Sequence, residues 1–176
     1  MINTNTTIMF TKTRNVKSPT RGTGEAAGID FFVPDCSGEF LVDLVKKNPG
    51  IELTITDDDL CICVKPQNRV LIPSGIKTWM VPGTALIAAN KSGVATKKGL
   101  VFGAQVVDSD YSGEVHISVI NTSTENVIIK SGEKLIQFIH TPVLLSPLVE
   151  VDNDAYTALH DKSERGDGGF GSTGTK

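Results

Sequence analysis

The C-terminal end of the chain holds a segment whose residue types suit a nucleoside polyphosphate. Residues 165–174 read RGDGGFGSTG, and five of these ten are glycine. Glycine lets backbone N–H groups approach an anion closely, because it has no side chain. Arg165 adds a fixed cationic fork, and Phe170 adds one flat apolar ring. Ser172 and Thr173 add hydroxyl donors. Phosphate donors beside a stacking surface indicate a nucleotide site, although a Gly/Ser-rich tail without any ligand has the same composition.

A second segment, residues 106–114 (VVDSDYSGE), places two carboxylates and an aromatic ring in a turn. The two β-branched residues before it and Gly113 after it predict a hairpin tip, which exposes side chains on a rigid base. Asp108 and Asp110 are two positions apart, so they share a face on extended backbone. One carboxylate suits a general base for water, and the other an orienting group or a metal partner. The alternative is an ordinary acidic turn that caps its own backbone.

Two further segments have weaker signals. Lys91, Ser92 and Gly93 combine a cation, a hydroxyl and a glycine at a predicted helix start, which fits an anion site or a simple serine cap. Residues 132–137 (GEKLIQ) read as a turn followed by an edge strand with a surface lysine. Either segment alone indicates no particular ligand.

These residues need a β scaffold to hold them. Short Val- and Ile-rich runs separated by Gly, Pro, Asn and Ser predict strands, which favour a sandwich or a barrel-like fold. The expected strands are 8–11, 29–33, 51–55, 60–64, 69–72, 76–81, 85–89, 115–121, 127–129 and 134–141. Two short helices are expected at 39–47, before Asn48-Pro49-Gly50, and at 92–97.

The domain organisation expected from this pattern is a single β domain over residues 1–141, with an insertion near 37–60. From residue 142 onward the pattern loosens, and we expect an extended arm over 142–176 that carries the glycine-rich motif.

Composition excludes several classes. A net charge of −3 argues against bulk nucleic-acid binding. Cys36, Cys61 and Cys63 cannot all pair, and no second Cys/His cluster accompanies them, so an intracellular, cytoplasmic setting without a zinc site is expected. No stretch reads as a secretory signal or a membrane span, so no membrane partner is expected.

Together these segments resemble the trimeric dUTPase family, with five motifs in the family's order from Ala26 to Gly174. The motifs are residues 26–30 (AAGID), 91–95 (KSGVA), 106–113 (VVDSDYSG), 132–137 (GEKLIQ) and the glycine-rich arm. The third and fifth are specific, and the others gain weight from their order. The resemblance implies a mostly β, dUTPase-like β-barrel or jelly-roll-like fold with one or two short helices and an extended C-terminal arm.

The resemblance also implies roles for the central residues. Asp108 matches the catalytic aspartate, which activates the water that attacks the α-phosphate. Tyr111 matches the tyrosine that packs under the deoxyribose and excludes a 2′-hydroxyl. The backbone before Asp108, with Gln105 and Val107, matches the segment that reads uracil. Asp30 matches an acidic residue that supports the metal and water network.

The remaining implied contacts are with the phosphates and the base. Residues implied to contact the phosphates within the body are Lys91, Ser92, Gly93 and Gln137. The arm is implied to close over the substrate, with Phe170 stacking on the base. The other arm residues implied to contact substrate are Arg165, Gly171, Ser172 and Thr173. The family's Mg²⁺ is bound mainly by the triphosphate and water, with no direct protein ligand expected here.

The implied activity is dUTP diphosphatase, which hydrolyses dUTP to dUMP and pyrophosphate in a homotrimer whose sites are shared between subunits. One alternative is a dCTP deaminase-like enzyme of the same superfamily, which shares the core but lacks the RGDGGFGSTG arm. Another is a nucleotide-sensing or protein-binding module on the dUTPase scaffold.

The chain departs from the family's pattern at several positions. Lys91 and Lys134 stand where arginine is usual, which keeps the charge and loses the bidentate fork. Gln105 stands where a glycine is usual, so its side chain is expected either to face outward or to reshape the base pocket. The insertion has no assigned role. Its run Asp57-Asp58-Asp59 fits a solvated acidic turn or a cation site.

Overall fold

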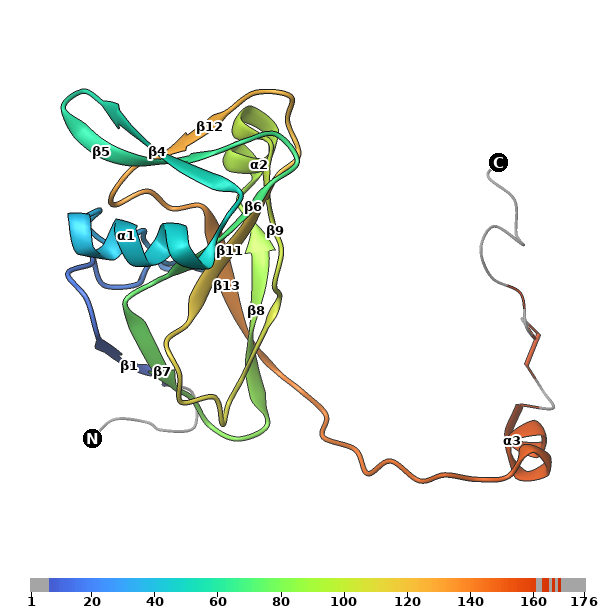
Figure 1. Cartoon of the computed structure of the whole chain (residues 1–176). Coiled ribbons are helices and arrows are strands. Elements are labelled where there is room, and N and C mark those ends of the chain that lie inside the picture. Colours follow the sequence, from blue (N-terminus) through green and yellow to red (C-terminus); the bar gives the residue numbers. More distant parts are fainter. Residues whose placement is uncertain (1–6, 161–162, 165, 167, 169–176) are drawn as a thin grey trace. The chain divides into compact units, whose positions relative to one another are not determined.

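A computed structural model of the chain describes residues 7–160, 163, 164, 166 and 168. The chain divides into two compact units, Met1–Leu144 and Leu145–Lys176. The described part of the first unit is mostly β, with two short helices (Figure 1). Among the described residues, no helix is both long and apolar enough to span a bilayer.

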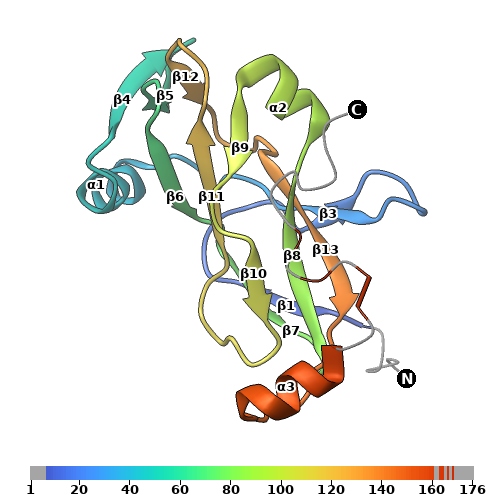
Figure 2. The same cartoon turned by 90° about the vertical axis from the view of Figure 1, so that its right-hand side faces the viewer.

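The described strands of the first unit pair antiparallel in four sheets. The largest sheet has the order β10-β8-β13-β3-β2, formed by Val106–Asp108, Thr84–Asn90, Ile136–Pro142, Gly28–Asp30 and Thr20–Arg21. A second sheet, β6-β11-β9, is formed by Arg69–Pro73, His116–Asn121 and Leu100–Phe102. The third, β12-β5-β4, is formed by Val127–Ile129, Asp59–Val64 and Ile51–Thr56. The fourth pairs β1 (Met9–Lys12) with β7 (Ile76–Trp79). Figure 2 shows β8 between β10 and β13.

The sheets enclose one hydrophobic core. Val115, Ile117 and Val119 are each at most 1% exposed, as their alternation with polar residues predicts. The rings of Phe31 and Phe138 pack at 4.8 Å between centroids. Burying each such side chain stabilises the fold by about 1.5–3 kcal/mol. The expected fold class is confirmed as mostly β and jelly-roll-like, and the described strands do not close into a barrel.

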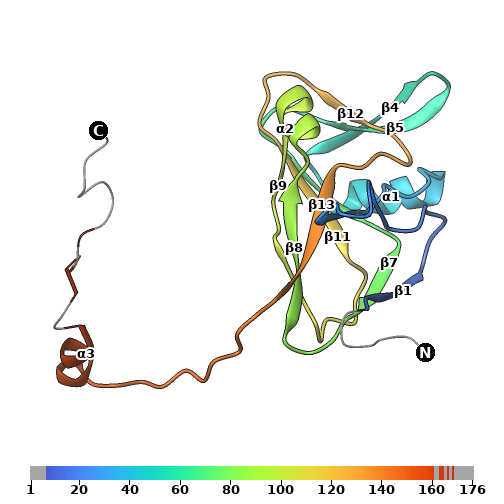
Figure 3. The same cartoon turned by 180° about the vertical axis from the view of Figure 1, so that it is seen from behind.

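The inserted segment belongs to this core. Helix α1 (Gly38–Lys47) buries Phe40, Leu41 and Leu44 in the same hydrophobic cluster as the sheets. The helix contacts β4 and β6. Figures 1 and 3 show it below the β4–β5 hairpin from opposite sides. The insertion is therefore part of the folded body.

The hairpin between β4 and β5 turns at the aspartate run. Asp57 and Asp58 have φ angles of 54° and 64°. Such positive φ values at both central residues are typical of a two-residue type I′ hairpin turn, in which aspartate is tolerated. Lys130 Nζ lies 2.6 Å from Asp57 Oδ2. The triple aspartate thus forms an acidic turn with one partner cation.

The segment before β11 differs from the expected hairpin. Strand β10 pairs with β8, through Val107↔Leu86 and Asp108↔Ala85. Strand β11 pairs instead with β6 and β9. Residues 109–115 are therefore a connection between two sheets, and the prediction of a hairpin there was wrong. Three-residue β10 offered too short an alternating pattern to reveal its partner.

Several element boundaries also differ from those expected. Strand β3 ends at Asp30, and the buried run Phe31–Val33 continues as irregular chain up to Pro34. Val33 is still tied to the turn before β13, because its N–H donates to Glu133 O at 2.9 Å. Strand β13 correspondingly begins at Ile136, two residues later than expected. Strands β2 and β9, each three residues or fewer, were not expected.

The second unit contains helix α3 (Asn153–His160), where an irregular arm was expected. The Asp152 carboxylate accepts a hydrogen bond from Ala155 N at 2.8 Å and so caps the first turn. The helix buries no residue. The helix is only eight residues long, and so short a segment gave too little periodicity to predict it.

Candidate functional site

The first candidate cluster surrounds the buried carboxylate of Asp30 at the end of β3. Its side chain is 5% exposed, and each of its oxygens has a lysine partner. Lys91 Nζ lies 2.5 Å from Oδ1, and Lys134 Nζ lies 3.0 Å from Oδ2. Burial raises the pKa of Asp30. The hydrogen bonds from both lysines, together with their charges, lower that pKa by more than burial raises it, so the pKa lies below its ordinary value. Two cations on one carboxylate leave a net positive charge, which favours an anionic ligand.

Strand register brings this cluster together. Asp30 on β3 pairs with Gln137 on β13, and Ile136 pairs with Asn90 at the end of β8. The chain then turns through Lys91 into helix α2 (Ser92–Lys98). The ends of three neighbouring strands thus meet at one edge, where residues 92 and 93 are exposed.

The side chain of Gln137 is oriented by this edge as well. Its Nε2 donates to Asn90 O at 2.9 Å, and its carboxamide lies over Gly28. A Cβ at position 28 would lie 1.9 Å from Gln137 Oε1. Glycine at this position is therefore what allows Gln137 to lie across β3.

A third lysine, absent from the expected site, joins this edge. Lys17 Nζ lies 5.7 Å from the ring centroid of Phe32, and Lys134 Nζ lies 6.0 Å from the same centroid. At exposed sites, a cation–π interaction between an ammonium and an aromatic face contributes about 0.5–1 kcal/mol of stabilisation. Lys17 lies outside every motif, and no local pattern in the sequence marks it.

The second candidate cluster is a cavity of about 170 Å³ beside β10. Its lining includes Gln105, Val107, Asp108 and Tyr111, all expected from the sequence. Gln105 is exposed, and its backbone carbonyl is held by a 2.7 Å hydrogen bond from Ala88 N. The other lining residues are Ala104, Val106, Val115, His116 and Phe138. A concave surface with apolar side chains, an exposed carboxylate and a tyrosine ring suits a small planar ligand.

The two clusters lie at opposite ends of β8. Asp108 pairs with Ala85 near the start of that strand, whereas Lys91 follows its last residue, Asn90. Six residues of extended chain span about 20 Å, at about 3.4 Å per residue. A base must lie within hydrogen-bond reach of the proton that it accepts. One copy of the chain therefore does not bring Asp108 to the cationic edge, and the expected residues form two separated half-sites.

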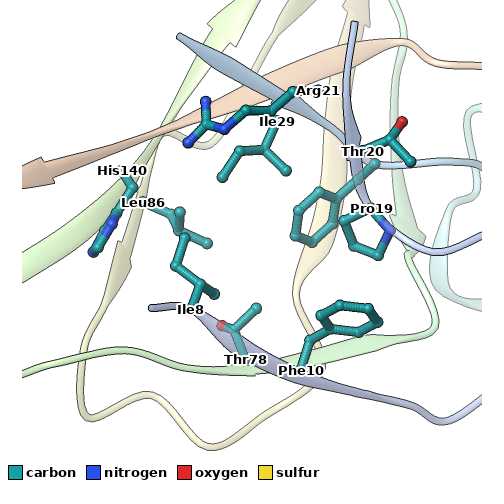
Figure 4. A pocket seen from close by; sticks show the side chains of 10 residues that line it. Ile8, Phe10, Pro19, Thr20, Arg21, Ile29, Thr78, Leu86 and His140 are labelled. Carbon is teal, nitrogen blue, oxygen red and sulfur yellow. The ribbon is translucent and has the colours of Figure 1, made fainter. Parts of the chain in front are cut away.

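A larger cavity, of about 260 Å³, contains none of the expected site residues (Figure 4). Most of its wall is apolar, and Ile8, Ile29 and Leu86 form one side of it. Within the described residues, Thr78 Oγ1 and His140 Nε2 are buried without a hydrogen-bond partner. Burial, followed by the charge of Arg21, lowers the pKa of His140. Arg21 is the one cation among its described lining residues, and its guanidinium already donates to the carbonyls of Ala26 and Ala27. This wall therefore does not suit a triphosphate.

Two remaining groups of expected features lie elsewhere. The arm residues expected to contact substrate lie outside the described residues; they are Arg165, Phe170, Gly171, Ser172 and Thr173. Within the part of the chain that the structure describes, no three His, Cys, Asp or Glu side chains gather in a way that would hold a metal ion. Both Asp30 oxygens are already paired with lysines.

The chain matches known proteins over most of its length. Residues 52–174 match the dUTPase family. A deoxyuridine 5′-triphosphate nucleotidohydrolase from Hydrogenobaculum sp. (strain Y04AAS1) is 36% identical over 129 residues, which cover 72% of this chain and 84% of the relative.

Solved structures show the same fold. A mutant dUTPase of Staphylococcus bacteriophage 80alpha, with dUpNHpp, aligns at a TM-score of 0.70 and 20% identity, covering 96% of this chain and 99% of that one. A mutant dUTPase of phage phi11 of S. aureus, described with a structural Mg(II) ion, aligns at a TM-score of 0.65 and 18% identity. The alignment covers 84% of this chain and 97% of that one. With the family match and the 36% identical relative, these place the motifs on a shared scaffold, and the chain belongs to the dUTPase family.

Proposed function

We propose that this protein hydrolyses dUTP to dUMP and pyrophosphate, with Asp108 as the general base. The dUTP diphosphatase activity follows from membership of the dUTPase family and from the relative's name. The observation that supports the site assignment is the pair of half-sites, one cationic at Asp30 and one concave at Asp108. The first suits a triphosphate, and the second suits a base and sugar.

The proposed reaction is an in-line displacement at the α-phosphorus. A water oxygen forms a bond to that phosphorus while its proton passes to the Asp108 carboxylate. The bond from the α-phosphorus to the oxygen bridging to the β-phosphorus breaks, and pyrophosphate leaves with the bonding electrons. Asp108 suits this role because its side chain is exposed at the cavity, where water reaches it.

The cationic edge would hold the phosphates. Lys91 is fixed by Asp30, and the exposed Ser92 and Gly93 follow it at the start of α2. Gln137 presents its carboxamide from β13. Fixed donors of this kind stabilise the charge that develops on the phosphates, because they need no reorganisation during the reaction. Arg165, Ser172 and Thr173 of the arm are proposed to hold the γ-phosphate.

The cavity beside β10 would hold the nucleoside. The backbone from Gln105 to Val107 is proposed to hydrogen-bond uracil, and Tyr111 to pack under the deoxyribose. Because the Gln105 side chain is exposed, it need not fill the base pocket. Phe170 and Gly171 of the arm are proposed to cover the base.

A complete site then requires a second copy of the chain. The separation of about 20 Å along β8 keeps Asp108 of one copy away from Lys91 of the same copy. Trimers are typical of dUTPases, and we infer a homotrimer here, with each site shared and closed by an exchanged arm. The second unit supports association, since Leu145 and Leu148 are 77% and 99% exposed.

Mg²⁺ is the cofactor that dUTPases generally use. The donor set here fits an ion held by phosphate oxygens and water, because the described residues offer a cationic edge and isolated carboxylates. When bound, Mg²⁺ neutralises phosphate charge and favours departure of pyrophosphate. Asp30 is proposed to support it through the surrounding water.

Pyrophosphate release from a panel of deoxynucleoside triphosphates and UTP, with Mg²⁺, tests the proposal. We expect release from dUTP well above that from dCTP, dTTP or UTP. Consumption of dCTP with release of ammonia would instead identify a deaminase. Binding of nucleotide without any turnover would identify a sensing module on the same scaffold.

The role of Tyr111 in sugar choice gives a prediction. Tyr111→Ala should narrow the ratio of kcat/KM for dUTP over UTP by roughly tenfold or more, because the space that a 2′-hydroxyl needs becomes free. The ratio is measured by initial rates on both substrates. An unchanged ratio would assign the ring to packing.

The proposed contact between Lys91 and a phosphate gives another prediction. Lys91→Ala should lower kcat/KM by roughly 10- to 100-fold, because a charge-assisted phosphate contact is lost. Lys91→Arg should be tolerated, since it restores a bidentate fork. Lys47→Ala, which breaks the exposed Lys47–Asp43 pair on α1, serves as the control for loss of a lysine. Equal activity of the Ala and Arg variants would place the phosphate contact elsewhere.

A further inference from the structure

The ring of Tyr111 is held in place by the two residues that follow Ser112. Its hydroxyl donates to the backbone carbonyl of Glu114 at 3.1 Å. The ring lies over Gly113, where a Cβ would be 2.3 Å from the phenol oxygen. The position of the ring therefore depends on where the backbone of residue 114 lies.

That backbone is fixed through the side chain of Glu114. Arg14 Nε and Nη2 donate to its two carboxylate oxygens at 2.9 and 3.2 Å, and Gly75 N donates to Oε1 at 2.6 Å. The glutamate side chain is only 16% exposed. Burial raises the pKa of Glu114, but the contacts with Arg14 and Gly75 lower that pKa below its ordinary value, so the carboxylate is charged at neutral pH. A bidentate pair of this kind fixes orientation as well as distance.

Arg14 in turn contacts the inserted helix. Its guanidinium carbon lies 5.4 Å from the ring centroid of Phe40 on α1, and that ring is buried in the core. Both Arg14 and α1 precede residues 52–174, the part that matches the family. The contacts thus run without a gap from the insertion to the sugar-binding tyrosine.

We propose that Arg14 and Glu114 are positioning residues for Tyr111, and that α1 acts through them on the choice between deoxyribose and ribose. The proposal rests on the proposed function, in which Tyr111 packs under the sugar. It assigns to the insertion a role in substrate specificity, exerted from outside the nucleotide site. Phe40 orients Arg14, Arg14 orients Glu114, and the Glu114 carbonyl orients the phenol.

A double-mutant cycle on the full chain tests this relay. Tyr111→Phe removes only the hydroxyl, and Arg14→Met removes the ion pair at similar side-chain length. Each single variant should narrow the dUTP/UTP ratio of kcat/KM about two- to tenfold, as expected for loss of one hydrogen bond. The double variant should narrow it no more than either single variant, because both act through one contact.

Three companion variants separate the relay from general damage. Arg14→Lys should recover part of the ratio, since it keeps the charge without the fork. Phe40→Leu should narrow the ratio slightly, because it keeps apolar bulk and loses the ring face. Lys65→Met breaks the ion pair between Glu52 on β4 and Lys65, the residue after β5, and it should leave the ratio unchanged.

The outcomes distinguish this proposal from the one on which it rests. Equal loss of activity on dUTP and UTP in Arg14→Met, or additive effects in the double variant, would overturn the relay. If Tyr111→Ala itself leaves the ratio unchanged, the assigned role of Tyr111 fails and the relay fails with it. If Tyr111→Ala narrows the ratio and Arg14→Met does not, only the relay is wrong.

Discussion

Replacing Asp108 with asparagine is expected to lower kcat for dUTP by about 10³-fold, within the range that a positioned general base contributes. The amide has nearly the same shape as the carboxylate but does not take up the proton of the attacking water. Because the side chain is exposed at the end of β10, the change should leave the fold intact. Single-turnover rates and the binding of a non-hydrolysable dUTP analogue measure the two effects separately.

Asp110→Asn is the matched control for Asp108→Asn. Asp110 lies two residues further along, is also exposed, and does not line the cavity. We expect it to retain most activity and an unchanged melting temperature. Near-normal turnover in Asp108→Asn, or equal losses in both variants, would refute the assignment of the base.

Removal of residues 165–176 is expected to reduce kcat/KM for dUTP by roughly 10²-fold, because the γ-phosphate contacts and the cover over the base are lost together. Five glycines among residues 165–174 make this segment costly to order, so contacts with the triphosphate must offset that entropy. The melting temperature and the oligomeric state should change little, since the segment begins beyond α3.

The variant Phe170→Trp tests whether residues 165–176 close over the bound nucleotide. Its fluorescence should change when a non-hydrolysable dUTP analogue and Mg²⁺ are added, because the indole would stack on uracil. Trp79 is the only native tryptophan, so the parent protein supplies the background. Loss of the trimer on truncation would make the segment structural. Full activity after truncation, together with a silent indole, would disprove closure.

Local sequence patterns predicted most of the scaffold. The alternation around Val115, Ile117 and Val119 identified a strand with one buried face, and the stop signal at Asn48-Pro49-Gly50 predicted the end of α1 correctly. Such signals depend on neighbours within one turn or one strand. The family resemblance was confirmed by the match of residues 52–174 to the dUTPase family and by the 36% identical relative.

Contacts between distant residues were not predictable in this way. The pair Arg14–Glu114 joins residues 100 positions apart, and nothing near either residue marks it. The pairing of β10 with β8 instead of β11 depends on which sheet edge is free, a property of the whole fold. The position of Lys17 at the cationic edge was also not predictable, because it depends on a contact with the distant residue Phe32.

In the proposed homotrimer, the separation of the half-sites along β8 would place the residues of one site on two chains, so the unit that a gene encodes would differ from the unit that catalyses. A defect at Asp108 and a defect at Lys91 in two alleles would fall in different sites of a mixed trimer, so some sites would keep both native residues. Activity would also depend on protein concentration, because dilution dissociates the trimer. The separated chains would then be folded but inactive. The seven-residue length of β8 would thus mean that a single chain has no complete site for hydrolysis.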